Sequence, residues 1–500
     1  MSPFRRLPFL LGTAALIAAG APACAWADTP ARARAEAQAQ LARIARYEGA
    51  VNAIIVHDAN AARDAAAAAA AHPGSPIAGR TVLIKDNIET REWPTTAGSL
   101  ALAGNATGRD APLVARLRGA GAVIMGKTNL SEWANIRSGS STSGWSAVGG
   151  LTRNPHALDR NACGSSSGSG AAVAAGFAWA AVGTETDGSV TCPASLNGVV
   201  GFKPTVGLVS RTYVVPISHS QDTPGPMTRT VADAALLLTA MAGPDPADPA
   251  TALANGRVPR DFAAGLAAAS LKGQRIGVLR RQAGSNDKLT AVFDAALADM
   301  KRAGAELVEI DYTPDPAMGR DEYGVLLFEL REDLGAYLRG LPGKPKVRSL
   351  ADVIAFDAAT PAEMRWFGQD TFEEAEHATD RAAYEKARAN SLRLAGKDGI
   401  DKLLADNRVT MLVAPTEGPA WPLDLVTGAG GLRGVGAGNL AAIAGYPHLT
   451  VPMGAVEGLP IGLSFIAGAW DDAKVLQAGA AYERARTARI SAPSFRRWGE

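Results

Sequence analysis

Short apolar runs of strand length alternate with helical stretches along most of this 500-residue chain. Helices are predicted over residues 31–46, 59–71, 111–119 and 288–303, where apolar residues recur at helical spacing or alanine dominates. Strands that alternate with helices favour an α/β fold, in which helices cover a largely parallel or mixed sheet. The strand-like runs are VNAIIVH (51–57), TVLIKDN (81–87), AVIMGKTN (122–129), RIGVLR (275–280), ELVEI (306–310), TMLVAPT (410–416) and PHLTVPMG (447–454).

Two other stretches bear on how the chain is organised. AGPDPADPATA (242–252) carries the strongest linker composition, with three prolines in eleven residues. Residues from about 311 to 405 are rich in helix-forming patterns, and we expect them to form a cap over the functional site. A chain of this length can bury a large core in one domain or in two to three smaller ones.

The overall charge balance excludes some classes of partner. The chain has 50 basic and 49 acidic residues, a net charge of +1, and is 47% hydrophobic. Proteins that bind nucleic acid or an anionic membrane surface present an excess of basic residues, which is missing here. The composition is typical of a soluble globular protein with no nucleic-acid partner.

The N-terminus has the three parts of a secretory signal peptide. Arg5 and Arg6 form a basic region, PFLLGTAALIAAGA follows as an apolar core, and AWA (25–27) is a small-residue cleavage site. We therefore predict that residues 1–27 are removed, that 28–500 form the mature protein, and that it is periplasmic or secreted. No stable membrane association is expected after cleavage.

Two cysteines, Cys163 and Cys192, lie beyond the predicted cleavage site. In an exported protein they could form a disulfide, or they could be buried free thiols. The free thiols are the simpler interpretation of the sequence. The chain shows no cysteine and histidine spacing of the kind that binds a metal ion.

Two familiar motif patterns match the chain but lack the surroundings that each requires. Residues 121–128 fit the GxxxxGK[ST] pattern of a phosphate-binding loop, yet the four intervening residues are apolar and read as a strand. Residues 164–168 fit the GxSxG pattern of a hydrolase elbow, but a loop precedes them where a buried strand is needed. None of His219, His377 and His448 has the context of a triad histidine.

A lysine and two serine-rich stretches offer a different chemistry. NACGSSSGSGAAVAAG (161–176) holds Ser165, and GTETDGSVTCPAS (183–195) holds Ser189 on what reads as a tight turn. Lys85 follows the apolar strand TVLI, so it is predicted to be buried. Burial disfavours the charged ammonium and lowers the pKa of a lysine, which makes it able to act as a base near neutral pH.

These segments together resemble the amidase signature family. The resemblance extends through LIKDN, MGKTNLSEWAN, CGSSSGSG, GTETDGS, NGVVGFKPTVGLVSR, SQDTPGPMTRTVADAALLL and AGYPHLTVPMG. It implies a single amidase-signature domain over 28–500, with an α/β/α fold in which helices cover both faces of a large mixed sheet. It further implies that Ser189 is the nucleophile, Ser165 a bridging serine and Lys85 the base.

The same resemblance implies how these groups act. The backbone N–H groups of Thr186, Asp187 and Gly188 would form the oxyanion hole, and a cis peptide bond would precede Ser165. No metal or cofactor is implied. The other serines of the first stretch would bond nearby backbone and cap a helix over 171–181. Asp86 would orient Lys85 or cap a turn, and Asp222 would line the pocket or form a turn.

Some details of the motifs are similar to the peptide amidase branch of the family. Cys163, Ser167 and Asp187 stand where glycines are usual in the wider family. The resemblance therefore implies hydrolysis of the C-terminal amide of peptides to an acid and ammonia. The alternatives are a general amidase that acts on fatty or aryl amides, and a non-catalytic or amide-transfer subunit.

Overall fold

The computed structural model describes residues 29–428, 430–432 and 434–500. An 11-stranded mixed sheet runs through it in the order β1-β3-β2-β8-β10-β9-β14-β15-β13-β11-β12. The strands of this sheet are β1 (Ile54–His57), β2 (Thr81–Lys85), β3 (Val123–Thr128), β8 (Ala180–Glu185), β9 (Val200–Lys203), β10 (Thr223–Thr228), β11 (Arg275–Leu279), β12 (Glu306–Ile310), β13 (Met411–Pro415), β14 (His448–Val456) and β15 (Leu459–Ile466). Two small hairpins lie outside it: β4 (Trp145–Ser146) with β5 (Gly150–Leu151), and β6 (Arg153–Asn154) with β7 (Ala157–Asn161).

The sheet combines parallel and antiparallel pairs. β2 lies between β3 and β8 and is parallel to both, and β11 is parallel to β12 and β13. The central strands β10, β9, β14 and β15 pair antiparallel. The helices are α1 (Pro30–Val51), α2 (Ala61–Ala71), α3 (Pro112–Gly119), α4 (Ser167–Ala174), α5 (Thr191–Leu196), α6 (Val231–Met241), α7 (Asp287–Arg302), α8 (Pro316–Arg339), α9 (Leu350–Ala358), α10 (Asp370–Glu376), α11 (Arg381–Leu392), α12 (Lys402–Asn407), α13 (Gly438–Ala444) and α14 (Asp472–Ala485).

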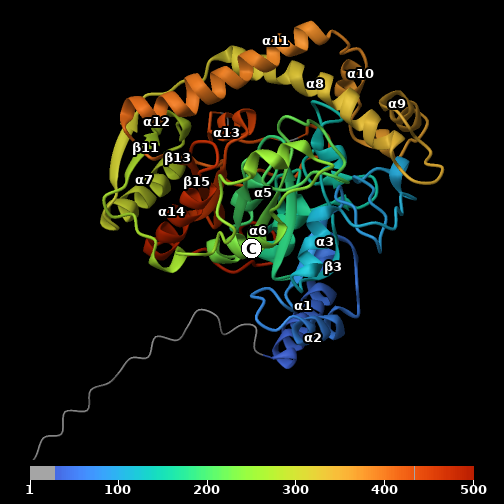
Figure 1. Ribbon diagram of the computed structural model, residues 1–500, viewed down its shortest axis with the longest axis horizontal. Helices are drawn as coiled ribbons and strands as arrows, with labels where there is room; N and C mark the ends of the chain where they lie inside the picture. Colours follow the sequence, from blue (N-terminus) through green and yellow to red (C-terminus); the bar gives the residue numbers. More distant parts are fainter. Residues whose placement is uncertain (1–28, 429, 433) are drawn as a thin grey trace, which may run out of the picture.

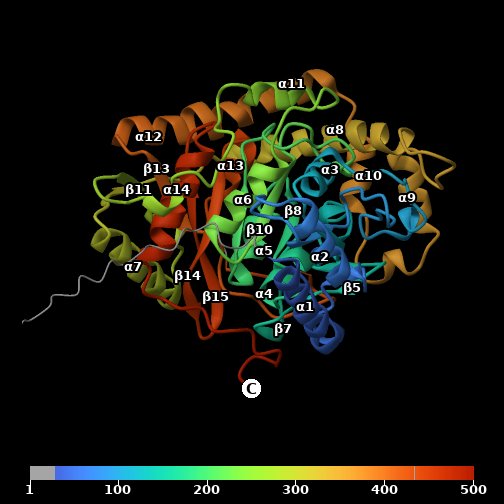
Figure 2. The same ribbon diagram turned by 60° about the horizontal axis from the view of Figure 1, so that its bottom comes forward.

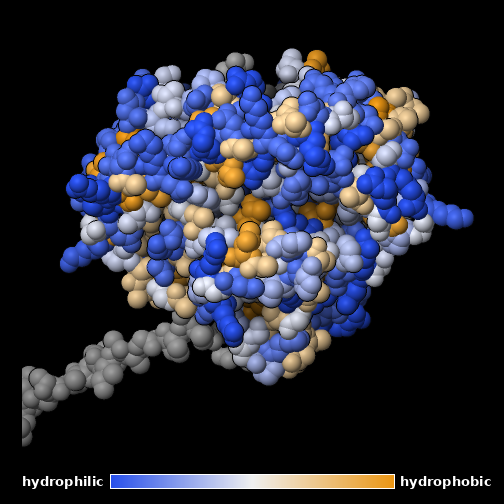
Figure 3. All heavy atoms as spheres, turned by 45° about the horizontal axis from the view of Figure 1, so that its top comes forward, coloured by the Kyte–Doolittle hydropathy of each residue, from blue (hydrophilic) through white to orange (hydrophobic). Residues whose placement is uncertain are grey.

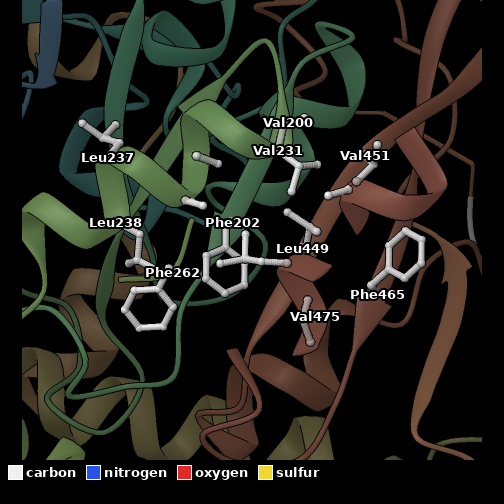
Figure 4. Close-up of a cluster of buried hydrophobic side chains, with 14 of the residues drawn as sticks. Val200, Phe202, Val231, Leu237, Leu238, Phe262, Leu449, Val451, Phe465 and Val475 are labelled. Atoms are coloured by element: carbon white, nitrogen blue, oxygen red, sulfur yellow. The ribbon is translucent and has the colours of Figure 1, made fainter. Parts of the chain in front are cut away.

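Helices cover both faces of the sheet, because successive side chains of a strand point to opposite sides. On β2, Val82 and Ile84 join a core cluster to which α3, α6, α7 and α14 contribute, part of which Figure 4 shows. Leu83, between them, joins a second cluster with residues of α1, α4 and α5. Figure 2 shows the strands between these layers. The predicted α/β/α fold with a large mixed sheet is confirmed.

A band of helices spans one side of the molecule. α8 and α11 run along the top of Figure 1, and α9 and α10 lie near one end of the band. A π-helical segment (Arg393–Asp401) joins α11 to α12. These helices belong to the segment that the sequence predicts as a cap, and we call α8–α12 the cap. Seen from this side, the surface is mostly hydrophilic, and hydrophobic residues gather in a hollow near its centre (Figure 3).

Several local predictions are wrong in their bounds or in their kind. The helix predicted over 171–181 ends at Ala174, and Ala180 already belongs to the buried strand β8. The predicted linker over 242–252 is tied to the body of the protein, because Asp248 is 5% exposed and accepts hydrogen bonds from Arg211. The predicted signal peptide, 1–27, lies outside the described residues. Among the residues described, no helix is long and apolar enough to span a membrane.

Candidate active site

Lys85, the last residue of β2, is fully buried and holds the centre of the site. Its Nζ lies 2.7 Å from the Oγ of Ser165 and 2.8 Å from the Oγ1 of Thr184. A third contact, at 3.2 Å, joins Nζ to the backbone oxygen of Thr184. Burial lowers the pKa of Lys85 to about 7, although the nearby charges of Asp222 and Glu185 act in the opposite direction. Near neutral pH this amine therefore exists in a neutral form that can accept a proton.

Polar groups on the neighbouring strand β8 and in the segment that follows β2 fix the position of Lys85. Asn87, two residues on, donates its Nδ2 to the Thr184 Oγ1 at 2.9 Å. The adjacent Asp86 faces elsewhere, since its Oδ1 lies 2.9 Å from the Nζ of Lys127 and its Oδ2 accepts from Thr96. Asp86 therefore does not orient Lys85 directly.

The serine-rich stretch that begins at 161 is ordered by close packing. The peptide bond between Gly164 and Ser165 is cis, as the family resemblance implies. A Cβ at Gly164 would overlap the Oγ of Ser131, and one at Gly168 would overlap backbone oxygens. Glycine is required at both positions because neighbouring groups approach the backbone closely.

The serines around Ser165 bond to the backbone of adjacent segments. Ser166 donates to the oxygen of Thr184 at 3.1 Å, and Ser169 to that of Val182 at 3.2 Å. Ser167 donates to the Cys163 oxygen. The predicted bonds to nearby backbone are present, but the prediction of a side-chain cap on the helix is wrong, since Ser166 at the N-cap makes no such bond.

Cys163 and Cys192 form a disulfide with a Cα–Cα distance of 6.0 Å, so the favoured interpretation of two free thiols is wrong. The bond links the segment before Ser165 to the first turn of α5, which follows Ser189. Spacing in the sequence could not decide this, because the 29-residue separation is compatible with either state.

The turn that contains Ser189 presents free backbone donors. In the described part of the chain, the N–H groups of Asp187, Gly188 and Ser189 donate no hydrogen bond. Gly188 has φ +76°, and the space beside its Cα is open. Successive N–H groups around a left-handed residue form a concave site for negative charge. The Ser189 oxygen accepts from the N–H of Ser166 at 3.1 Å, which joins the two serine loops.

The competing motifs have no functional geometry. Residues 123–128 of the GxxxxGK[ST] match form the buried strand β3, and Lys127 is paired with Asp86. In the GxSxG match, Ser166 is buried and bonded to backbone. His448 contacts Ser464, at 2.6 Å, and not a serine of this stretch.

Sequence reasoning missed the residues that hold the two loops. Glu185 accepts the N–H groups of Val190 and Thr191 at 2.8 and 2.9 Å, which fixes the start of α5. Thr184 accepts a hydrogen bond from the Lys85 amine. The only signal for Thr184 and Glu185 is that they stand in the same polar stretch as Ser189. Asp222, which the sequence named as a pocket-lining or turn residue, accepts the Oγ1 of Thr186 at 2.6 Å and the N–H groups of Ile217 and Ser218 in its own loop.

Comparison with known proteins identifies the class. The family model described as Amidase matches residues 36–476, and the chain belongs to this amidase signature family. A probable amidase of Arabidopsis thaliana is 39% identical over 81% of this chain and 76% of its own length. A glutamyl-tRNA(Gln) amidotransferase component from Nocardia farcinica is 35% identical over 90% and 94%.

A solved structure narrows the comparison further. The native peptide amidase of Stenotrophomonas maltophilia is 45% identical, covers 93% of this chain and 95% of its own, and superposes with a TM-score of 0.86. The protein is an amidase, a hydrolase that cleaves an amide C–N bond.

Proposed function

We propose that the protein hydrolyses carboxamides through Lys85, Ser165 and Ser189, by way of a covalent acyl-enzyme. The observation that carries the proposal is the 2.7 Å contact between the buried Lys85 amine and the Ser165 hydroxyl. A lysine with a pKa near 7 is a competent base at the pH where it works. Serine hydroxyls are weak nucleophiles until such a base activates them.

In the first half-reaction, neutral Lys85 takes the proton of Ser165 while Ser165 takes that of Ser189. The Ser189 Oγ bonds to the carbonyl carbon, and the π electron pair moves to the carbonyl oxygen. The intermediate collapses as the C–N bond breaks and the relay returns its proton to nitrogen, which leaves as ammonia. Water then attacks the ester in the same way and releases the acid.

The negative oxygen of both intermediates would lie among the free N–H groups at 187–189, and the resemblance adds the N–H of Thr186. Donors aimed at a developing oxyanion commonly supply 10²–10³-fold in rate, about 3–4 kcal/mol each. We therefore expect Ser189→Ala to lose at least ~10⁴-fold in kcat, because no nucleophile remains. Hydrolysis retained by that variant would reject the assignment of Ser189.

We further propose that the substrate is the C-terminal amide of a peptide. This is supported by the 45% identity to a peptide amidase across nearly the whole chain. The test is ammonia release from a short amidated peptide, a fatty amide and an aryl amide, with Ser189→Ala as the control. Turnover of the peptide alone supports the proposal, and turnover of only the other amides leaves a general amidase.

The similarity to an amidotransferase component defines a second outcome of the same assay. An amide-transfer subunit would pass ammonia to a partner and would be expected to act with that partner. Strong release of free ammonia by the isolated chain argues against that role.

We also propose that the protein is exported, which the disulfide supports, because such bonds persist in oxidising compartments.

A further inference from the structure

The loop 217–222 joins the cap to the turn that holds Ser189. In this loop Gln221 is 1% exposed, and its Nε2 donates to the Oε1 of Glu322 on α8 at 2.9 Å. The same nitrogen lies 3.3 Å from the backbone oxygen of Thr186. One buried amide therefore connects the cap helix to the turn.

The cap helix holds this loop by three acidic side chains on one of its faces. Glu322, Glu329 and Asp333 are seven and four residues apart, a spacing that places them in one row along a helix. Glu329 accepts the N–H and the hydroxyl of Ser220 at 3.1 and 2.9 Å. Asp333 accepts the N–H of His219 at 2.7 Å. The position of the loop is thus set by α8.

Glu322 also reaches the turn directly. Its side chain shares a hydrogen bond with that of Asp187, which in addition accepts the Nδ2 of Asn439. Two carboxyl groups can bond to each other only when one of them carries a proton. Desolvation raises the pKa of both carboxyl groups, and the nearby Glu322 raises that of Asp187 further, which favours a proton shared between them.

The hydrogen bond from Gln221 has a stereochemical consequence. The oxygen of Thr186 and the N–H of Asp187 belong to one planar peptide unit and point in opposite directions. Fixing the oxygen therefore fixes the direction of the N–H. Within the described residues that N–H has no acceptor, and it is one of the donors assigned above to the oxyanion.

We propose that Gln221, held by Glu322, is a positioning residue that aims the Asp187 N–H at the oxygen of the tetrahedral intermediate. The inference rests on the proposed function, because it assumes that Ser189 forms this intermediate. In this arrangement the position of α8 affects the rate of the reaction through Gln221 and Glu322, although neither side chain touches the reacting atoms.

The test replaces Gln221 by leucine, which keeps much of the volume and removes both hydrogen bonds. A misaimed donor loses part of the 10²–10³-fold that an oxyanion donor supplies, so we expect kcat to fall about 10–100-fold. KM for the amidated peptide should change less than about threefold, because the donor stabilises the negative oxygen of the intermediate more than the neutral carbonyl oxygen of the bound substrate.

A peptide aldehyde and the matching peptide acid separate positioning from a loosened fold. Ser189 adds to the aldehyde carbon, its proton passes through Ser165 to Lys85, and the carbonyl electron pair becomes the charge on the oxygen. The acid product forms no such adduct. Gln221→Leu should therefore weaken the aldehyde by the same factor as kcat/KM, and leave the affinity of the acid within about threefold.

Two further variants serve as controls. Glu322→Gln can still accept from Gln221 and donate to Asp187, so it should keep kcat within about threefold, whereas Glu322→Leu should resemble Gln221→Leu. Gln369, another buried glutamine of the cap, donates to the oxygen of Ile354 at 3.2 Å. Gln369→Leu should leave the ratio of aldehyde to acid affinity unchanged.

Equal losses of aldehyde and acid affinity in Gln221→Leu, or no loss of either, would overturn the positioning role. So would a Glu322→Gln variant as slow as Glu322→Leu. The proposed function fails separately, when Ser189→Ala still releases ammonia. If Ser189→Ala is inactive and Gln221→Leu behaves as the wild type, only the positioning role is lost.

Discussion

At the scale of single residues, the pKa of Lys85 predicts the pH dependence of the reaction. The relay needs the neutral amine, so kcat/KM should rise tenfold per pH unit below about 7 and level off above it. The inflection belongs to the free enzyme and is measured with a neutral amidated peptide between pH 5 and 9. Lys85→Ala should lose both the inflection and ~10³-fold or more of the rate.

Another buried lysine provides the control for this profile. Lys203 is also fully buried, and burial lowers its pKa to about 8, but its Nζ donates to the oxygen of Pro204 and, among the residues that the structure describes, to no serine. Lys203→Met should keep the inflection near pH 7. If the inflection survives in Lys85→Ala and disappears in Lys203→Met, the base is Lys203 and the assignment of Lys85 is wrong.

The same burial predicts that Lys85 lowers stability. Its pKa is about 7 in the folded protein against 10.5 in the unfolded chain, so between these values the unfolded chain binds the extra proton. Stability therefore rises with pH through this window, and at pH 7 it lies about 4–5 kcal/mol below its value above pH 10.5. Lys85→Met removes this cost and loses hydrogen bonds worth about 1 kcal/mol each.

We therefore expect Lys85→Met to be about 2 kcal/mol more stable than the wild type at pH 7 and to have lost this advantage at pH 9, where the cost of the buried amine is about 2 kcal/mol smaller. Urea unfolding at the two pH values measures the difference. An advantage that is independent of pH would mean that the gain comes from packing alone, and that the amine is not the group whose titration costs stability.

At the scale of elements, the disulfide ties the two serine loops together. Cys163 lies two residues before Ser165 and has φ +56°, a region that favours glycine, and Cys192 lies three residues after Ser189. Closing a loop of 29 residues stabilises a protein by about 3–4 kcal/mol through the unfolded chain. The double variant Cys163→Ser, Cys192→Ser should lose about this much free energy of unfolding, measured by urea unfolding. At urea concentrations that unfold the variant but not the wild type, the variant should also lose its activity.

The strands and helices of the sheet differ in how well they could be predicted. Those with a simple apolar or alanine-rich pattern, such as β2 and α7, match their predicted positions closely. β10 (TPGPMT) escaped prediction because prolines are rare inside sheets. Pro224 and Pro226 pair with β8, but β9 pairs only with Met227 and Thr228, so each proline has a neighbouring strand in register on one side only.

At the scale of the whole molecule, the site was predictable only where its residues stand in local motifs. Lys85 and Ser165 were named from short stretches and lie in contact, although 80 residues separate them. Gln221 and Glu322 were not named, because their role depends on how the cap packs on the body, and contacts between residues 101 apart leave no pattern in a single sequence. The disulfide was the less favoured of two interpretations, because the spacing of the two cysteines does not show how their loops pack together.

The proposed export concerns the whole chain, and the state of the disulfide provides a way to test it. If the leader is cleaved after Ala27, the mature protein begins at Asp28, which intact mass spectrometry of the secreted or periplasmic protein detects. That protein should show no thiol that reacts with maleimide when denatured without reductant. Beyond the leader the chain contains only Cys163 and Cys192, so reduction should expose two.

A chain that lacks residues 2–27 stays in the reducing cytoplasm and should carry both thiols free, because glutathione and thioredoxin keep cytosolic cysteines reduced. It should unfold at lower urea concentration than the exported form, by the ~3–4 kcal/mol of the missing bond, and recover on oxidation. The serine double variant is the matched control, since its stability should not depend on the compartment. A cytoplasmic form that is fully oxidised and equally stable would remove the link between the disulfide and export, and a full-length chain found uncleaved in the cytoplasm would contradict export itself.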